Sequence, residues 1–193
     1  MAAHAESTSI ESGVSHAKLG MWLFLASEIM LFSTLFTSYI IFRVTAPAWP
    51  HGWEVLNIPL GTLNTAILIT SSVTMVFAYA AALARDRAGF QKHLGATIAL
   101  SFCFLIVKYF EYSHKFEAGH FPSTNMFYGV YFTMTGLHGI HVICGIIANS
   151  ILLWMSGRDF NEDFFAGRIE AAGLYWHFVD IVWIFLFPTI YLL

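Results

Sequence analysis

Five stretches of the sequence are each long and apolar enough to cross a membrane, and this feature constrains the fold more than any other. They cover residues 19–43, 57–84, 93–117, 125–155 and 171–192. A membrane-spanning helix needs about 20 mostly apolar residues. Only 11% of the 193 residues are charged, which is too few to cover the surface of a soluble domain. The sequence therefore predicts an all-α integral membrane bundle of five transmembrane helices, with one domain at residues 19–193 after a tail at residues 1–18.

The basic residues predict the direction in which the chain crosses the membrane. The N-terminal tail and the second and fourth loops hold Lys18, Arg85, Arg87, Lys92, Arg158 and Arg168. The opposite side holds only Arg43 and Lys115. Because Lys and Arg accumulate in cytoplasmic loops, this bias predicts a cytoplasmic N-terminal tail and a periplasmic C-terminus. The sequence contains no basic run of the kind that binds nucleic acid, so no nucleic-acid partner is expected.

Glu28 is an isolated carboxyl group deep in the first apolar stretch, in "WLFLASEIMLFS". An ionisable residue within a membrane span is costly and is often functional, so one interpretation is a proton-relay or regulatory carboxyl. The other is a structural, hydrogen-bonded carboxylic acid, because burial disfavours the charged form of a carboxyl group. A proton-coupled transporter that uses Glu28 is one alternative function. The sequence shows no internal repeat that would support it.

Two further pairs of ionisable residues share a helix face. His138 and His141 are three residues apart in "TGLHGIH", and His177 and Asp180 are three apart in "YWHFVD". Such histidines could bind a metal or haem, and a membrane oxidoreductase using His138, His141 and His177 is a second alternative. They could instead form hydrogen bonds between helices, which we favour because the usual catalytic metal site has three protein ligands. Asp180 lies at about the depth of Glu28, so their helices could meet there.

A last group of charged residues forms a stripe at spacings of three and four near the end of the third apolar stretch. Its members are Lys108, Glu111, His114 and Lys115. Long side chains near the end of a span extend toward the membrane surface. We therefore interpret the stripe as an outer interfacial feature, with Lys–Glu pairing along one helix face.

Several long motifs resemble subunit III of the haem–copper oxidases. They are "SEIMLFS", "LNTAILITSSVT", "FEYSH", "YGVYFTMTGLHGIHVICG" and "YWHFVDIVWIFLFPTIYLL", and they occur in order from about residue 18 to the C-terminus. The longer family members have seven spans, whereas this sequence resembles the five-span bacterial form. By this resemblance, the buried carboxyl group of the family corresponds to Glu28. The histidines and the aspartate of the family's last two helices correspond to His138, His141, His177 and Asp180.

The resemblance implies a subunit of a proton-pumping terminal oxidase of aerobic respiration, in the bacterial inner membrane. In that family subunit III has no redox centre, whereas subunits I and II hold the haems and copper. The expected role is to pack against subunit I, to bind phospholipid and to sustain proton uptake and turnover. Subunit II and a small subunit IV are further expected partners. Whether cytochrome c or quinol donates the electrons depends on those other subunits. The resemblance implies no catalytic residue and no metal ligand in this chain.

Overall fold

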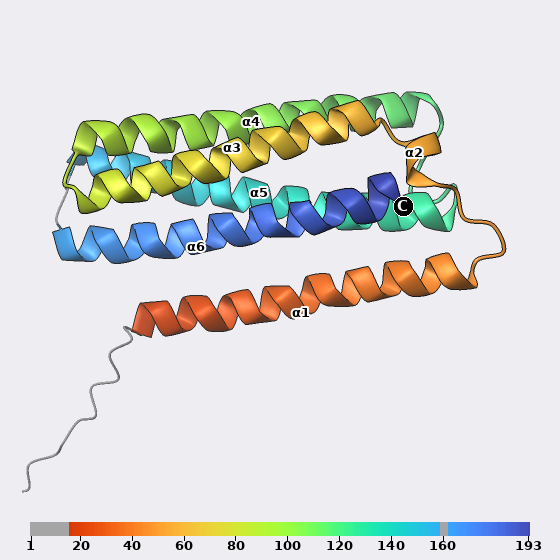
Figure 1. Cartoon of the computed structure of the whole chain (residues 1–193), viewed down its shortest axis with the longest axis horizontal. Coiled ribbons are helices and arrows are strands. Elements are labelled where there is room, and N and C mark those ends of the chain that lie inside the picture. The colour runs from red at the N-terminus through yellow and green to blue at the C-terminus, as the bar shows by residue number, and fades with distance from the viewer. Residues whose placement is uncertain (1–15, 159–161) are drawn as a thin grey trace, which may run out of the picture.

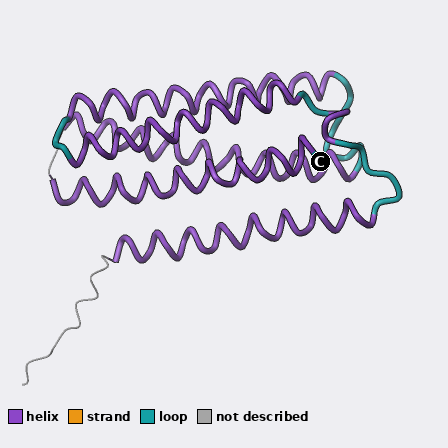
Figure 2. Tube along the Cα trace, in the orientation of Figure 1, coloured by secondary structure: helices purple, strands orange, loops and turns teal. Residues whose placement is uncertain are grey.

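The computed structural model describes residues 16–158 and 162–193, and all regular structure in those residues is helical (Figure 2). The five long helices are α1 (His16–Thr45), α3 (Ile58–Leu83), α4 (Arg87–Glu117), α5 (Met126–Arg158) and α6 (Glu162–Phe187). A short helix α2 (Gly52–Val55) precedes α3, and a π-helical turn η1 (Pro188–Leu192) continues α6. Within the described residues, five helices are long and apolar enough to span a membrane. The predicted all-α bundle of five spans is therefore confirmed.

Local sequence signals explain where α3 and α4 begin. The Asn57 side chain accepts a hydrogen bond from the backbone N–H of Leu60, and the Asp86 side chain accepts one from Gly89. Side-chain oxygens at these positions satisfy backbone N–H groups that have no partner inside the helix. Only residues 84–86 separate α3 from α4, so these two helices pack as an antiparallel pair along their length.

The helices α3, α4, α5 and α6 form a common core, and α1 lies along the outer side of α6 (Figure 1). In the apolar window of each span, 50% of residues are buried in α6 but only 11% in α1. The core of the bundle includes the fully buried rings of Trp176 and Trp183 on α6. Gly145 on α5 permits this packing, because a Cβ atom there would lie 2.6 Å from the Trp176 ring. The helix α1 is thus the most loosely packed of the five.

Each end of the bundle is named after one residue that lies there. The Arg85 end contains the beginning of α1, the α3–α4 turn and the beginning of α6 (Figure 1). The Asn57 end contains the end of α1, the helix α2, the α4–α5 loop and η1. The predicted orientation puts the Arg85 end in the cytoplasm.

Reporter fusions at Gly89 and Gly119 test this orientation. Gly89 lies in the first turn of α4 at the Arg85 end, and Gly119 follows α4 at the Asn57 end. From the Lys and Arg bias we expect a cytoplasmic signal from the Gly89 fusion and a periplasmic signal from the Gly119 fusion. The reverse pattern would show that the orientation is wrong.

Candidate functional site

Glu28 forms a side-chain contact that joins α1 to α5. Its Oε2 atom lies 2.9 Å from Nε2 of His141, and His141 Nδ1 lies 2.8 Å from the Leu137 carbonyl oxygen. A carbonyl oxygen only accepts, so Nδ1 carries a hydrogen. Nε2 then either accepts the proton of a neutral Glu28 or donates its own proton to the carboxylate. In both states the pair shares one proton and has no net charge.

The partner of Glu28 is not Asp180, which the sequence places at about the same depth. Depth along a helix is readable from sequence, but the rotation of the helix about its axis depends on packing. Here Phe32 of α1 packs edge-on against the His141 ring, with 5.2 Å between ring centroids, and against Phe178 of α6. This packing directs the Glu28 face of α1 toward α5.

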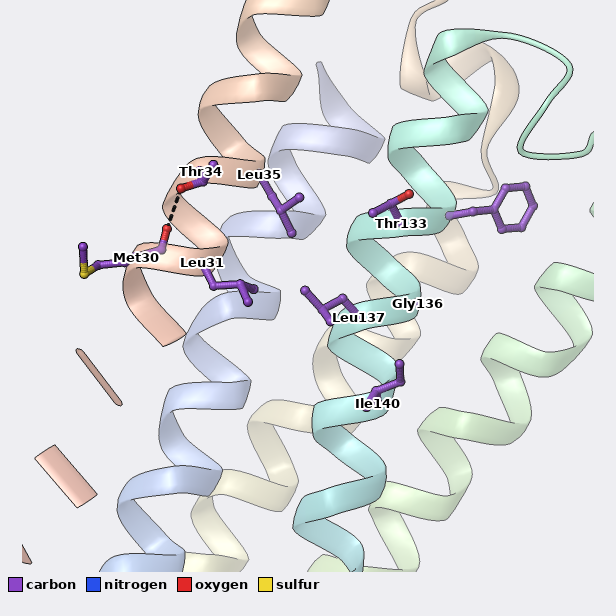
Figure 3. Close-up of a pocket in the computed structure, with 9 residues that line it drawn as sticks. Met30, Leu31, Thr34, Leu35, Thr133, Gly136, Leu137 and Ile140 are labelled. Carbon is purple, nitrogen blue, oxygen red and sulfur yellow. Dashed lines mark hydrogen bonds between the residues drawn. The ribbon is translucent and has the colours of Figure 1, made fainter. Parts of the chain in front are cut away.

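Apolar grooves flank α1 on both sides. One, of about 660 Å³, lies between α1 and α5, where Leu31 and Leu35 of α1 point toward Leu137 of α5 (Figure 3). The other, of about 710 Å³, lies between α1 and α6 and includes Trp22 and Phe185. The Glu28–His141 pair therefore connects α1 to the bundle between two apolar grooves.

His177 and Asp180 do not hydrogen-bond to each other, although they share a face of α6. His177 Nδ1 lies 2.7 Å from the hydroxyl of Ser72 on α3. The side chain of Ser72 also lies beside the carboxyl group of Asp180, but without hydrogen-bond geometry. Asp180 is only 4% exposed, and neither of its carboxyl oxygens has a hydrogen-bond partner among the described residues. Their shared helix face therefore does not bring His177 and Asp180 into a hydrogen bond with each other.

His138 is fully buried in the aromatic core. Its ring packs against Phe104 and Trp183, with centroid distances of 5.6 and 5.2 Å. Neither ring nitrogen has a hydrogen-bond partner within the described part of the chain. Although His138 and His141 share a helix face in the sequence pattern, the first lies in the core and the second contacts α1. They do not form one site.

The predicted interfacial stripe is wrong for two of its four residues, Lys108 and Glu111. They are 7% and 3% exposed and lie inside the bundle rather than extending to the membrane surface. Lys108 Nζ lies 2.9 Å from Glu111 Oε2 and 2.5 Å from the Tyr191 hydroxyl oxygen. The other carboxyl oxygen of Glu111 accepts hydrogen bonds from Tyr131 and Tyr191, at 3.0 and 2.6 Å. The buried pair is thus satisfied by hydrogen bonds from α5 and η1.

Sequence reasoning missed the two tyrosines that complete this network. A buried tyrosine hydroxyl needs a hydrogen-bond partner, and this requirement was the only signal in the sequence. The partner lies on another helix, so the sequence alone does not identify it. Lys108 also lies 4.7 Å from the Trp183 ring centroid, a cation–π contact that further favours its burial. The other two residues of the stripe remain near the Asn57 end. His114 is exposed, and Lys115 donates a hydrogen bond to the carbonyl oxygen of Val55.

The ionisable residues do not assemble into a metal centre in the part of the chain that the structure describes. No group of three or more His, Cys, Asp or Glu side chains is placed there to hold a metal ion. His141 instead contacts Glu28, and His177 contacts Ser72. The geometry of these residues is that of interhelical hydrogen bonding, with one buried structural ion pair between Lys108 and Glu111.

Comparison with known proteins identifies the family. The family model described as cytochrome c oxidase subunit III matches residues 3–193. The cytochrome c oxidase subunit 3 of Synechocystis sp. is 43% identical over 178 residues, which cover 90% of this chain and 74% of the relative. The cytochrome bo(3) ubiquinol oxidase subunit 3 of Pseudomonas aeruginosa is 31% identical, over 90% of this chain and 83% of the relative. A heme-copper oxidase subunit I+III of Aeropyrum pernix is 34% identical, over 89% of this chain and 22% of the relative. The chain is therefore a multi-pass membrane protein that belongs to the cytochrome c oxidase subunit III family.

Proposed function

We propose that this chain is a subunit without a redox centre in a proton-pumping terminal oxidase of a bacterial inner membrane. It packs against subunit I, binds phospholipid and sustains proton uptake and turnover. The observation that carries this proposal is the family match over residues 3–193. The haems and copper of the complex would belong to partner subunits, with the electron-entry copper in subunit II when it is present. A small subunit IV is a further proposed partner.

Contact with subunit I is supported by the Aeropyrum pernix relative, whose name describes subunits I and III in one chain. Two segments of one polypeptide are held at high local concentration, so an interface between them is expected. This chain also exposes many large apolar side chains along its helices. Part of that surface would face subunit I and the rest would face lipid. The relatives include a cytochrome c oxidase and a ubiquinol oxidase subunit, so the donor would follow from the partner subunits.

The two grooves beside α1 support lipid binding. Both are lined mainly by apolar residues, and each has a volume of the order that a segment of an acyl chain requires. Because few residues of α1 are buried, acyl chains in these grooves would supply packing that protein side chains do not.

Loss of this subunit should shorten the working life of the oxidase more than it lowers the initial rate. We expect the purified complex without this chain to begin oxygen reduction at a rate similar to that of the complete complex. It should then lose activity earlier during continuous turnover, because the redox centres remain in the other subunits while lipid packing and proton uptake are impaired. Oxygen consumption in liposomes measures both quantities, and adding back the purified chain is the control. Identical time courses with and without the chain would contradict the proposed function.

A further inference from the structure

A third groove opens between α3 and α6 at the Arg85 end. It lies apart from the two grooves beside α1, except that Leu174 and His177 of α6 line both this groove and the α1–α6 groove. Its volume is about 270 Å³. Tyr79 and Glu170 contribute polar groups to it, and His177 lies at its deeper end. Glu170 also forms a 2.6 Å ion pair with Lys18, and both side chains are partly exposed. The groove therefore begins at a charged, accessible surface.

Polar side chains continue from this groove into the membrane span. Glu170, Gly173, His177 and Asp180 are spaced by three, four and three residues, so they occupy one face of α6. Tyr79, Val76 and Ser72 follow a matching face of α3, and Ser72 bonds His177 at 2.7 Å. Gly173 leaves room along this line, because a Cβ atom there would meet only the Met75 side chain, at 3.7 Å. The line ends at Asp180, about 15 Å along α6 from Glu170.

Asp180 needs a partner that the surrounding side chains do not provide. Asp180 is 4% exposed, and both of its carboxyl oxygens lack a hydrogen bond within the described residues. Burial of a polar group without a hydrogen bond costs several kcal/mol, and buried water commonly supplies the missing bonds. Water that enters the groove would meet His177 and Ser72 before it reached Asp180.

We propose that the α3–α6 groove is a water inlet that lets Asp180 exchange protons with the aqueous phase at the Arg85 end. Water molecules would bridge the groove, the His177–Ser72 pair and the Asp180 carboxyl. The carboxylate would take a proton from hydronium and leave water, and would return the proton by the same route. The inlet does not depend on the oxidase role proposed above.

Other ionisable groups near Asp180 have partners of their own or lie apart from the inlet. On α5, His141 is bonded to Glu28 of α1, and His138 lies between aromatic rings. On α4, Lys108 is bonded to Glu111. On α6 and α3, His177, Glu170 and Tyr79 belong to the inlet itself.

Infrared spectroscopy of the full chain in lipid nanodiscs tests the inlet. The difference spectrum between wild type and Asp180→Asn isolates the carboxyl C=O band of Asp180, which shifts when deuterium replaces the proton. We expect this shift within seconds of transfer to heavy water. Filling the groove by Val76→Phe should slow the shift by roughly tenfold or more, because a closed route leaves only local opening of the bundle.

Val73→Phe is the matched control, because Val73 and Val76 lie one turn apart on α3 with 48% and 49% exposure, and only Val76 lines the groove. The control should leave the exchange rate unchanged. Equal rates in Val76→Phe and wild type would overturn the proposal. Equal slowing in Val76→Phe and Val73→Phe would also overturn it. The same holds if the difference spectrum shows no carboxyl C=O band of Asp180 at any pH between mildly acid and mildly alkaline.

Discussion

Replacing Glu111 with glutamine is expected to lower the free energy of unfolding by about 3–5 kcal/mol, because it leaves the ammonium group of Lys108 buried without its counter-charge. Glu111 joins α4 to α5 and η1 through hydrogen bonds from Lys108, Tyr131 and Tyr191. The change would appear as a lower thermal midpoint of the purified chain in detergent and as reduced accumulation in the membrane.

Glu117→Gln is the control for this prediction, because Glu117 ends the same helix and is exposed. It should change stability by no more than about 0.5 kcal/mol. The double variant Lys108→Met, Glu111→Leu should recover part of the loss, since it leaves neither charge buried alone. Equal stability of Glu111→Gln and Glu117→Gln would show that the Lys108–Glu111 pair does not stabilise the bundle.

Replacing Glu28 with leucine is expected to destabilise the attachment of α1 by about 1–3 kcal/mol, because His141 loses the partner of its Nε2 atom. The helix α1 has few other buried contacts, so a loss of this size should be large for α1. We expect lower assembly of the chain with its partners and reduced retention of lipid. Quantitative analysis of subunits and phospholipid in the purified complex measures both effects.

Glu28→Gln is the corresponding control. The substitution removes the titratable proton, but the glutamine amide can still donate a hydrogen bond to His141 Nε2. The complex containing it should assemble and should keep most of its initial oxidase rate. If it assembled normally but did not reduce oxygen, Glu28 would be an obligatory proton carrier and the structural interpretation would be wrong.

Length and hydropathy were enough to predict the five helices and the all-α fold. A segment that crosses the lipid must be apolar along its length. Every backbone polar group in it must be hydrogen-bonded within the protein, so a single apolar segment of this length nearly always forms a helix. Glu28 and Asp180 were also expected on helices that run in the same direction, and α1 does pack beside α6.

The partners of those residues could not be predicted, because they depend on how each helix is rotated about its axis. Glu28 contacts His141 of α5 rather than a residue of α6, and His177 contacts Ser72 rather than Asp180. Lys108 and Glu111 were expected to extend toward the membrane surface. They are buried because Tyr131 and Tyr191, from distant parts of the sequence, provide hydrogen bonds at the centre of the bundle.

The most direct test of the account is the distribution of haem and copper in the complex that co-purifies with this chain in mild detergent. We expect subunit I to co-purify and the complex to show a haem spectrum. After the subunits are separated, metal analysis should find the iron and copper with the partner polypeptides and no stoichiometric metal with this chain. One haem or one copper ion per copy of this chain would contradict the account, as would purification without any oxidase subunit.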